Sequence, residues 1–463
     1  MQGEMNPVRD KALETSADSL ASRISNGMNF VVEGGKKLSG KVETSRSKNG
    51  AVALLAASLL NQGRTTLEHM PRIEEVNRLI EVLISIGVSV KWDDTSVMIE
   101  PPNPPAGGIT LNTINKSAAN KTRSILMFIG SLIHLFKKFD IPQSGGCTLG
   151  LRSVRPHLLA LEKFGVAIEA RTDSYRVNHT KLVPAEVVLY ESSDTATINA
   201  LLAASRIKGT SVIKYASANY QVQEVCGFLR TLGVGVDGIG TTTLTINGVA
   251  DINCDISYSV AEDPTDAMFF ISASIVTNSA VTITAVPIEF LEVELLILEK
   301  MGLKFKLTKP RLSENGITKL VDLHLAPSTL IAFPEKIHAR PYPGLNIDNL
   351  PFFAVIATQA KGTTLIHDWV YEKRAIYYTE LDRLGANTSL LDPHRISITG
   401  HSHLRAAEVI CPPALRPATI ILVAMLAAKG RSTLRNVYSI NRGYEDIVSR
   451  LQKLGASIES HSG

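Results

Sequence analysis

Cysteine is scarce in this chain. The 463 residues include four cysteines, none in a CxxC pair: Cys147, Cys226, Cys254 and Cys411. A zinc site or a disulfide framework would need closely spaced or paired cysteines. We therefore expect no metal site and no disulfides, and we expect the reducing conditions of the cytoplasm.

Long apolar runs are absent as well. The segment SILMFIGSLIHLF at 124–136 is interrupted by Ser131 and His134, and it falls short of the roughly 18 apolar residues that span a bilayer. We expect a buried helix there and no membrane insertion. Residues 1–27 mix acids with bases and lack an apolar segment, so they predict a polar N-terminal extension and not a secretory signal.

Charge of one sign is not concentrated anywhere. The formal net charge is +4, and Lys and Arg are spread along the chain without a basic block, which argues against nucleic acid as a partner. Hydrophobic residues make up 44% and charged residues 20%, the balance of a globular protein. At roughly 150 residues per domain, the length predicts two or three domains, and we expect two large ones in a monomer.

The chain does contain an internal repeat. Six times an amphipathic helix ends in an apolar residue that is followed by glycine and a strand; the glycines are Gly87, Gly165, Gly233, Gly302, Gly385 and Gly455. Glycine is favoured just after a helix because it readily adopts the left-handed backbone conformation required there. The regular spacing predicts six related units, three in each half of the chain.

Each unit also contains a helix without a polar face, followed by a turn and a strand. Examples are AVALLAASLL, INALLAASR, MFFISASIV, FFAVIATQA and ATIILVAMLAA. Such helices must be buried on all sides, so the pattern predicts an α/β fold of two domains built around buried helices. Segment 28–43 has no helix of its own, and we expect it to pack with the second half. The expected domains are 44–259 and 28–43 plus 260–463.

Cations stand at the starts of several buried helices. Lys48, Arg123 and Arg416 occupy such positions, where a positive charge opposes the helix macrodipole by about 0.3–1 kcal/mol. An anion bound by both the cation and the helix N-terminus would explain them. N-capping is sufficient to explain Ser193 and Asp263 at other starts. If the two halves face each other, these starts could line one cleft.

A glycine-rich loop carries one of the cysteines. In DIPQSGGCTLGLRSVRPH (140–157), Cys147 lies between glycines, and Arg152, Arg155 and His157 follow it. Nearby cations lower the pKa of a thiol and raise its reactivity, so a reactive cysteine is one interpretation. The alternative is a solvent-exposed loop whose cysteine has no role.

Several motifs resemble, in the right order, those of the enolpyruvyl transferase family, above all its bacterial members that act on UDP-N-acetylglucosamine. They are SKNG with Lys48 and Asn49, GGCTLGLR with Cys147 and Arg152, LNIDNLP with Asp348, EKR with Arg374, LRPA with Arg416 and NRGYE with Arg442. The resemblance covers nearly all of the chain from Met28 onward. It implies two inside-out α/β barrel domains with the active site in the cleft between them. It also implies transfer of an enolpyruvyl group from phosphoenolpyruvate to a hydroxyl, with no metal or organic cofactor.

The resemblance also implies roles for individual residues. Cations would bind phosphoenolpyruvate: Lys48, Arg152, Arg374, Arg416 and Arg442. Lys48 and Arg442 would also be catalytic, with Cys147 as the acid toward the methylene carbon and Asp348 as the base toward the acceptor hydroxyl. The acceptor would be bound by Asn49, Arg123, Arg155, His157, Ser193, Asp263 and Asp348. Adding an alcohol to an enol ether requires such an acid, a base and cations that stabilise the departing phosphate.

The chain departs from the family pattern at the acceptor site. Arg155 stands where the family has an aspartate that contacts uracil, and Glu191 stands where it has a lysine on the diphosphate. The acceptor is therefore expected to be UDP-N-acetylglucosamine, in peptidoglycan precursor synthesis, or another phosphorylated nucleotide or sugar, such as uridine monophosphate in a nucleoside antibiotic pathway. A third alternative is a non-catalytic nucleotide-binding relative, which the retention of Lys48, Cys147 and Asp348 disfavours.

Overall fold

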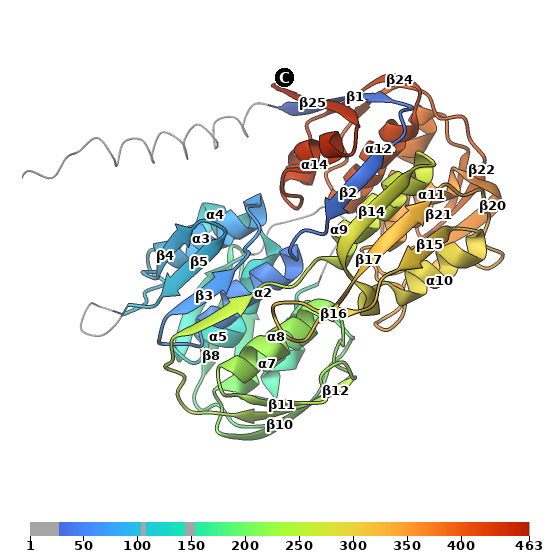
Figure 1. Cartoon of the computed structure of the whole chain (residues 1–463). Helices are drawn as coiled ribbons and strands as arrows, with labels where there is room; N and C mark the ends of the chain where they lie inside the picture. Colours follow the sequence, from blue (N-terminus) through green and yellow to red (C-terminus); the bar gives the residue numbers. More distant parts are fainter. Residues whose placement is uncertain (1–26, 103–107, 144–152, 463) are drawn as a thin grey trace, which may run out of the picture.

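The structure is a computed structural model that describes residues 27–102, 108–143 and 153–462. Within these residues the chain forms two halves, each with its own hydrophobic core (Figure 1). The sheets of the first half contain strands between Thr65 and Ser259, and those of the second contain the strands of Met28–Gly34 and Ser39–Glu43 together with strands from Ala280 onward. No helix in the described part of the chain is long and apolar enough to cross a membrane.

Helices without a polar face form the centre of each half, as the sequence predicts. In the first half they are α2 (Lys48–Ser58), α5 (Phe128–Leu132) and α7 (Asp194–Ser205), and in the second α9 (Pro264–Val276), α11 (Leu350–Ala357) and α12 (Leu415–Ala427). Every residue of α9 and α11 is buried, and the three central helices of the second half pack against one another. Each fully buried large aliphatic or aromatic side chain contributes about 1.5–3 kcal/mol, so these helices supply much of the stability.

Six small sheets surround these helices in the described residues. The strands of the first half are β3 (Thr65–Glu68), β4 (Ser89–Asp93), β5 (Ser96–Glu100), β6 (Lys138–Pro142), β7 (Val166–Ala170), β8 (Ser174–His179), β9 (Glu186–Val188), β10 (Gly209–Lys214), β11 (Gly235–Asp237), β12 (Thr243–Gly248) and β13 (Ile256–Ser259). Those of the second half are β1 (Met28–Gly34), β2 (Ser39–Glu43), β14 (Ala280–Pro287), β15 (Lys304–Leu307), β16 (Arg311–Leu312), β17 (Lys319–Ala326), β18 (Leu330–Ile331), β19 (Ile337–His338), β20 (Ala360–His367), β21 (Thr388–Asp392), β22 (Arg395–Gly400), β23 (Glu408–Ile410), β24 (Gly430–Arg435) and β25 (Ser457–Ser462).

Five of these six sheets share one arrangement, which identifies the repeating unit. A central strand has a parallel neighbour on one side and two successive antiparallel strands on the other; the central strands are β3, β10, β14, β20 and β24. The sixth sheet, β6-β8-β7, is antiparallel throughout.

Outer helices connect the strands of each unit and end at the repeat glycines. They are α3 (Glu74–Ser85), α6 (Arg155–Glu162), α8 (Tyr220–Thr231), α10 (Glu292–Met301), the 3₁₀ helix η3 (Ala375–Leu384) and α14 (Ile447–Lys453), with shorter helices at α4 (Lys116–Asn120), η2 (Ile288–Phe290) and α13 (Tyr438–Asn441). The six repeat glycines follow with φ between 84° and 105°. The left-handed helix ends predicted from the sequence are thus confirmed.

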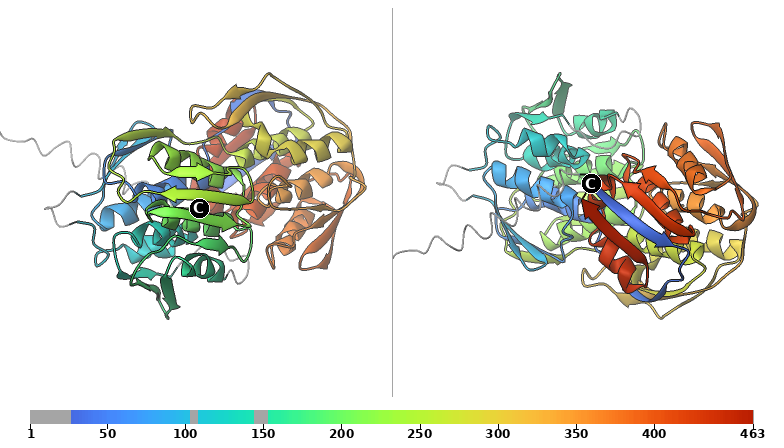
Figure 2. Two further views of the ribbon diagram at one scale, coloured as in Figure 1. Left: turned by 90° about the horizontal axis from the view of Figure 1, so that it is seen from below. Right: turned by 90° about the horizontal axis from the view of Figure 1, so that it is seen from above.

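The N-terminal segment belongs to sheets of the second half. Strand β1 lies between β24 and β25, and β2 pairs with β14 (Figures 1 and 2). Strand β13 lies beside β3 in the first half. The chain therefore crosses between the halves twice. The two crossing segments run side by side, because Ser47 N–H donates to Ala261 O (2.7 Å) and Asp263 N–H to Ser45 O (2.8 Å).

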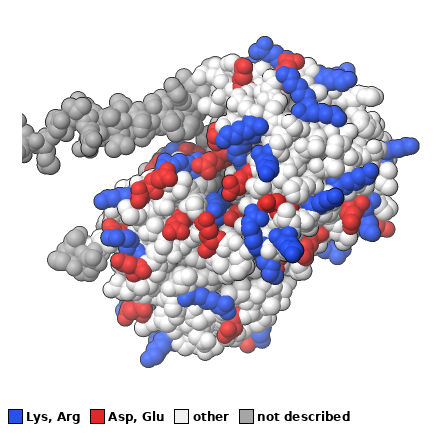
Figure 3. All heavy atoms as spheres, in the orientation of Figure 1, with Lys and Arg blue, Asp and Glu red and all other residues white. Residues whose placement is uncertain are grey.

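Charged side chains connect the halves at their boundary. On the face shown in Figure 3, acidic and basic side chains gather along this boundary. Glu314 of the second half lies 2.7 Å from His69 Nε2 and 3.7 Å from Arg46 Nη2. Such exposed contacts are individually weak, and they restrain the relative position of the halves without locking it.

The apolar run at 124–136 departs from the single helix predicted for it. Residues Arg123–Met127 form the 3₁₀ helix η1, and α5 begins only at Phe128. The side chain of Asn199 is the cause: its Nδ2 donates to Leu126 O and its Oδ1 accepts from Gly130 N–H, both at 2.8 Å. A continuous α-helix would join that carbonyl to that amide directly, so the inserted side chain breaks it.

Candidate functional site

A cavity of about 680 Å³ lies between the two halves, within the size range of small-molecule sites. The starts of five central helical segments open onto it, through Lys48 and Asn49 of α2, Arg123 of η1, Ser193 and Asp194 at α7, Asp348 before α11, and Leu415 and Arg416 of α12. The cations that oppose their helix macrodipoles therefore share one space, where an anion can reach them.

Glu75, the second residue of α3, connects cations from both halves. Its Oε2 lies 3.3 Å from Lys48 Nζ and 3.7 Å from Arg442 Nε. Its Oε1 accepts from Thr122 Oγ1 (2.9 Å) and Ser124 Oγ (3.0 Å). Burial disfavours the charged carboxylate, but Lys48, Arg442 and the two hydroxyls outweigh it and lower the pKa of Glu75 to about 2. Glu75 is therefore ionised, and it holds the two cations together.

Arg442 has an unused donor in this arrangement. Its Nε is buried and has no hydrogen-bond acceptor within the described residues, since the contact with Glu75 is an ion pair at 3.7 Å. A buried donor without an acceptor costs about 1–3 kcal/mol. An anionic ligand in the cavity would supply the missing acceptor.

Asp348 faces a second set of cations. Its Oδ2 lies 3.3 Å from Arg416 Nη2, and Arg416 Nη1 donates to the hydroxyl of Tyr444 (2.9 Å). Burial alone would raise the pKa of Asp348, but Arg416, Arg374 and Lys48 together hold it below its usual value. Asp348 is thus an ionised carboxylate on the cavity wall, able to accept a proton.

Arg374, expected to bind phosphoenolpyruvate, is already paired inside the protein. It is 1% exposed, and its Nε and Nη2 donate to the carboxylate of Asp368 at 2.6 and 3.0 Å. Its Nη2 also donates to the carbonyl of Ile347 (2.8 Å). Arg374 reaches the cavity lining, and these contacts fix the backbone next to Asp348. Its predicted contact with phosphoenolpyruvate stays a prediction.

Two residues expected to bind the acceptor lie on the cavity wall with defined partners. Asn49 Nδ2 donates to the hydroxyl of Tyr220 (2.9 Å). His157 is 3% exposed, with Nδ1 2.8 Å from Asn199 Nδ2 and Nε2 3.2 Å from Thr195 Oγ1. The structure therefore places His157 as a buried support of the wall.

Ser193 and Arg123 also line the cavity. Ser193 occupies the N-cap position of α7, but its side chain makes no capping hydrogen bond. The prediction that capping explains this serine is therefore wrong. Arg123 Nη2 donates to the carbonyl of Ser153 (2.7 Å), which connects η1 to the segment that leads into α6.

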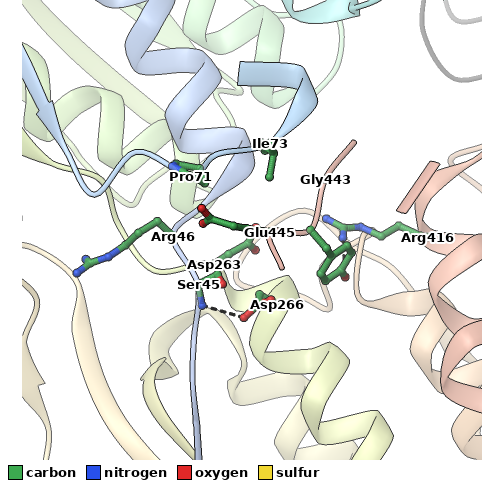
Figure 4. A pocket seen from close by; sticks show the side chains of 10 residues that line it. Ser45, Arg46, Pro71, Ile73, Asp263, Asp266, Arg416, Gly443 and Glu445 are labelled. Carbon is green, nitrogen blue, oxygen red and sulfur yellow. Dashed lines mark hydrogen bonds between the residues drawn. The ribbon is translucent and has the colours of Figure 1, made fainter. Parts of the chain in front are cut away.

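Asp263 and Arg155 are not among the residues that line this cavity, although Asp263 Oδ2 accepts from Lys48 N–H (3.4 Å). Asp263 caps α9 by accepting from Thr265 N–H (2.8 Å), as predicted from the sequence. It borders a small space of about 10 Å³ where the chain crosses between the halves (Figure 4). In the same place, Ser45 N–H donates to Asp266 (2.8 Å). Arg155 is exposed at the start of α6 and is not part of the cavity lining.

Cys147 and Arg152 lie outside the described residues. The other three cysteines are described, and each has a raised pKa. Burial raises the pKa of Cys226 and of Cys411 to about 12. Burial, followed by the charge of Asp255, raises the pKa of Cys254. Among the residues that the structure describes, no group of three or more His, Cys, Asp or Glu residues could hold a metal ion.

Comparisons with known proteins identify the family of this chain. The family model of EPSP synthase (3-phosphoshikimate 1-carboxyvinyltransferase) matches residues 32–451. A UDP-N-acetylglucosamine 1-carboxyvinyltransferase of Treponema denticola is 32% identical over 434 residues, 93% of this chain and 98% of the relative. The protein of that name from Borreliella burgdorferi is 30% identical over 431 residues, with the same coverage.

Solved structures share the fold. The crystal structure of the enolpyruvyl transferase NikO from Streptomyces tendae matches with a TM-score of 0.80 at 23% identity, covering 95% of this chain and all of that one. An EPSP synthase of Acinetobacter baumannii matches with a TM-score of 0.72 at 20% identity, over 94% of this chain. Because the family model and the curated relatives span almost the whole chain, the protein belongs to the EPSP synthase family and is an enolpyruvyl (1-carboxyvinyl) transferase.

Proposed function

We propose that this enzyme transfers the enolpyruvyl group of phosphoenolpyruvate to a hydroxyl of UDP-N-acetylglucosamine and releases phosphate, a step of peptidoglycan precursor synthesis. The observation that carries the proposal is the pairing of two charge centres on one cavity. Glu75 with Lys48 and Arg442 forms one, and Asp348 with Arg416 forms the other. The names and near-complete coverage of the curated relatives support the choice of acceptor.

Lys48 and Arg442 are the proposed ligands of phosphoenolpyruvate, together with Arg152. The unused Nε donor of Arg442 supports this role, because a phosphate or carboxylate oxygen would satisfy it. Cations also stabilise the phosphate as it departs. Glu75 orients both side chains, and the N-terminus of α2 at Lys48 favours an anion through the helix macrodipole.

Asp348 is the proposed base. Its carboxylate takes the hydroxyl proton of the acceptor while the acceptor oxygen bonds to C2 of phosphoenolpyruvate and the methylene carbon C3 takes a proton from Cys147. The bond between C2 and the phosphate oxygen then breaks as C3 loses a proton, which restores the double bond and releases phosphate. Its place on the cavity wall, with an ionised carboxylate, supports this role, because a base must be unprotonated to accept the hydroxyl proton.

The proposal also includes the barrel architecture and the domain boundaries. We assign each half to an inside-out α/β barrel domain, with boundaries at 44–259 and at 28–43 plus 260–463, and the active site to the cleft between them. The three sheets that surround three buried helices in each half support this assignment.

A different phosphorylated nucleotide is the second candidate acceptor. The observation in its favour is Glu191, which is exposed and lines the cavity. A carboxylate at this place repels a diphosphate, so an acceptor with its phosphate elsewhere, such as uridine monophosphate, would fit better.

The proposal is tested by phosphate release. The purified protein is incubated with phosphoenolpyruvate and, in separate reactions, UDP-N-acetylglucosamine, uridine monophosphate and shikimate 3-phosphate. Release with UDP-N-acetylglucosamine at least tenfold faster than with the other two is expected. Faster release with uridine monophosphate would establish the second candidate, and release with none would refute both.

A further inference from the structure

Three aromatic rings in the cavity lining remain exposed. Tyr190 is 74% exposed, Tyr215 50% and Trp369 49%, and all three line the cavity. Tyr190 and Tyr215 belong to the first half, and Trp369 to the second. Because aromatic side chains gain stability from burying a large apolar area, their exposure here is not explained by folding.

Tyr190 and Tyr215 follow the ends of neighbouring strands. Strands β9 and β10 are parallel, with Val188 opposite Lys214, and Leu189 N–H donates to Lys214 O (3.1 Å) just beyond. Among the described residues, neither tyrosine side chain has a hydrogen-bond or ring partner. By contrast, Tyr342 packs on Phe290 with ring centroids 5.3 Å apart. The two tyrosines therefore contribute little to packing.

Tyr215 has an unfavourable backbone conformation for its residue type. Its φ is 59°, a left-handed value that is uncommon for bulky residues and strains the backbone. The equivalent residues after β3 and β24, His69 and Asn436, have φ of 55° and 59°. The repeat thus requires the conformation, which asparagine tolerates well, but it does not require a tyrosine.

A carboxylate and two cations of the first half line different segments of the cavity wall. Glu191 is exposed beside Tyr190, whereas the cations Lys121 and Arg123 line the cavity from the α4–η1 segment. Glu191 repels a phosphate, whereas Lys121 and Arg123 attract it. The wall at the tyrosines is therefore suited to an uncharged, flat part of the ligand.

We propose that Tyr190 and Tyr215 form a stacking platform for the nucleobase of the acceptor, in a cavity that Trp369 lines from the second half. This inference rests on the proposed function and refines it, because it requires an acceptor with a base and assigns the base to this wall. Every base has a flat face, and stacking on an aromatic side chain strengthens binding by roughly tenfold or more per base.

Calorimetric affinities for two probes test the platform. Uridine monophosphate has a base, whereas N-acetylglucosamine 1-phosphate has a sugar and a phosphate but no base. Tyr190→Ala and Tyr215→Asn are each expected to weaken uridine monophosphate binding about tenfold and to leave the sugar phosphate unchanged. Tyr190→Phe and Tyr215→Phe keep the ring and should bind both probes like the unchanged protein. Asparagine at 215 suits the left-handed backbone, so this variant should fold.

A second readout locates the base. Trp92 and Trp369 are the two tryptophans of the chain, so in Trp92→Phe the fluorescence comes from Trp369 alone. Uridine monophosphate should change this fluorescence, with the same concentration dependence as the calorimetric titration. The platform would be overturned if Tyr190→Ala and Tyr215→Asn both keep their affinity for uridine monophosphate. It would also be overturned if the variants lose affinity for both probes equally, or if the unchanged protein does not bind uridine monophosphate.

The outcomes separate this inference from the proposed function. Base-dependent binding without phosphate release from phosphoenolpyruvate would refute the proposed function and leave the platform. If all three proteins release phosphate, and Tyr190→Ala and Tyr215→Asn have the same Michaelis constant for the acceptor as the unchanged protein, the platform is refuted. The proposed function would then still stand.

Discussion

At Glu75, one carboxylate pairs with two cations that come from opposite halves of the protein. The sequence offers no signal for this role, because Glu74 and Glu75 open α3 together and acids in a first helical turn are explained by the macrodipole. Only the folded structure separates them, since Glu74 pairs with Arg78 at 2.6 Å while Glu75 faces the cavity. The roles of Lys48 and Arg416 could be predicted from the sequence, because a cation at a helix start opposes the macrodipole and indicates a bound anion.

Glu75→Gln should lower kcat/KM for phosphoenolpyruvate at least tenfold. The amide keeps the shape but removes the charge that holds Lys48 and Arg442 in place, and loss of one charge-assisted contact is worth about 1.5–3 kcal/mol. Steady-state kinetics measure the effect. Glu74→Gln is the matched control and should stay within twofold of the unchanged protein; equal behaviour of both variants would contradict the role of Glu75.

Cys147→Ala should abolish turnover, whereas Ala at Cys226, Cys254 or Cys411 should leave it within a few-fold. The buried thiols at 226 and 411 have a pKa near 12 and are not nucleophiles at neutral pH. An epoxide analogue of phosphoenolpyruvate, followed by peptide mass spectrometry, should label Cys147 first. Cys254, which is partly exposed, is the informative comparison, and labelling of it at the same rate would count against a specially reactive Cys147.

At the scale of elements, the sequence predicts the repeat well because each signal is local. A helix with no polar face must be buried, and a glycine after a helix marks its end, so the central helices and the six glycine ends follow from composition alone. The break between η1 and α5 does not, because it depends on Asn199, which is 69 residues away from Gly130. Likewise, the loss of capping at Ser193 depends on the side-chain geometry at the cavity.

Helix α10 carries a buried acid that should make stability depend on pH. Glu294 Oε1 accepts from Asn346 N–H (3.1 Å) and Asn349 Nδ2 (2.8 Å), next to Asp348. Burial outweighs these bonds and raises the pKa of Glu294 from 4.5 to about 7. The folded state therefore holds this proton more tightly than the unfolded state. Its stabilising effect is complete below pH 4.5 and is lost as the pH rises through about 7.

Glu294→Gln should accordingly reduce the fall in Tm between pH 5 and pH 8 by a few degrees. Glutamine keeps the acceptor oxygen without a charge to bury, so the cost of ionisation at high pH disappears. Differential scanning calorimetry at the two pH values measures the change. Glu292→Gln, at an exposed position of the same helix, is the control, and an identical pH dependence in Glu294→Gln and the unchanged protein would rule out Glu294 as its source.

At the scale of the whole molecule, the two halves are joined by two crossing segments and by charged contacts around the cavity. Glu75 and Arg442 face each other from opposite halves, so ligand anions between them would draw the halves together. Saturating UDP-N-acetylglucosamine with an unreactive phosphoenolpyruvate analogue should therefore reduce the radius of gyration in small-angle X-ray scattering. An unchanged radius at saturation would show that the site does not close.

The similarity over the whole chain and the chemistry of the cavity wall favour different acceptors. Curated relatives at 30–32% identity act, by name, on UDP-N-acetylglucosamine, whereas Glu191 on the cavity wall disfavours a diphosphate nearby. The sequence alone indicates the unusual charge of Glu191 only because the chain resembles the enolpyruvyl transferase family, whose pattern has a lysine there. The structure adds that Glu191 lines the cavity and that Arg155 does not.

The chemical structure of the reaction product tests the proposed function most directly. UDP-N-acetylglucosamine and phosphoenolpyruvate are incubated with the enzyme, and the nucleotide product is examined by nuclear magnetic resonance. We expect a vinylidene CH₂ group of an enolpyruvyl ether on the 3-hydroxyl of the sugar, absent with Cys147→Ala. Recovery of unmodified UDP-N-acetylglucosamine, under conditions in which uridine monophosphate acquires the enolpyruvyl group, would contradict it.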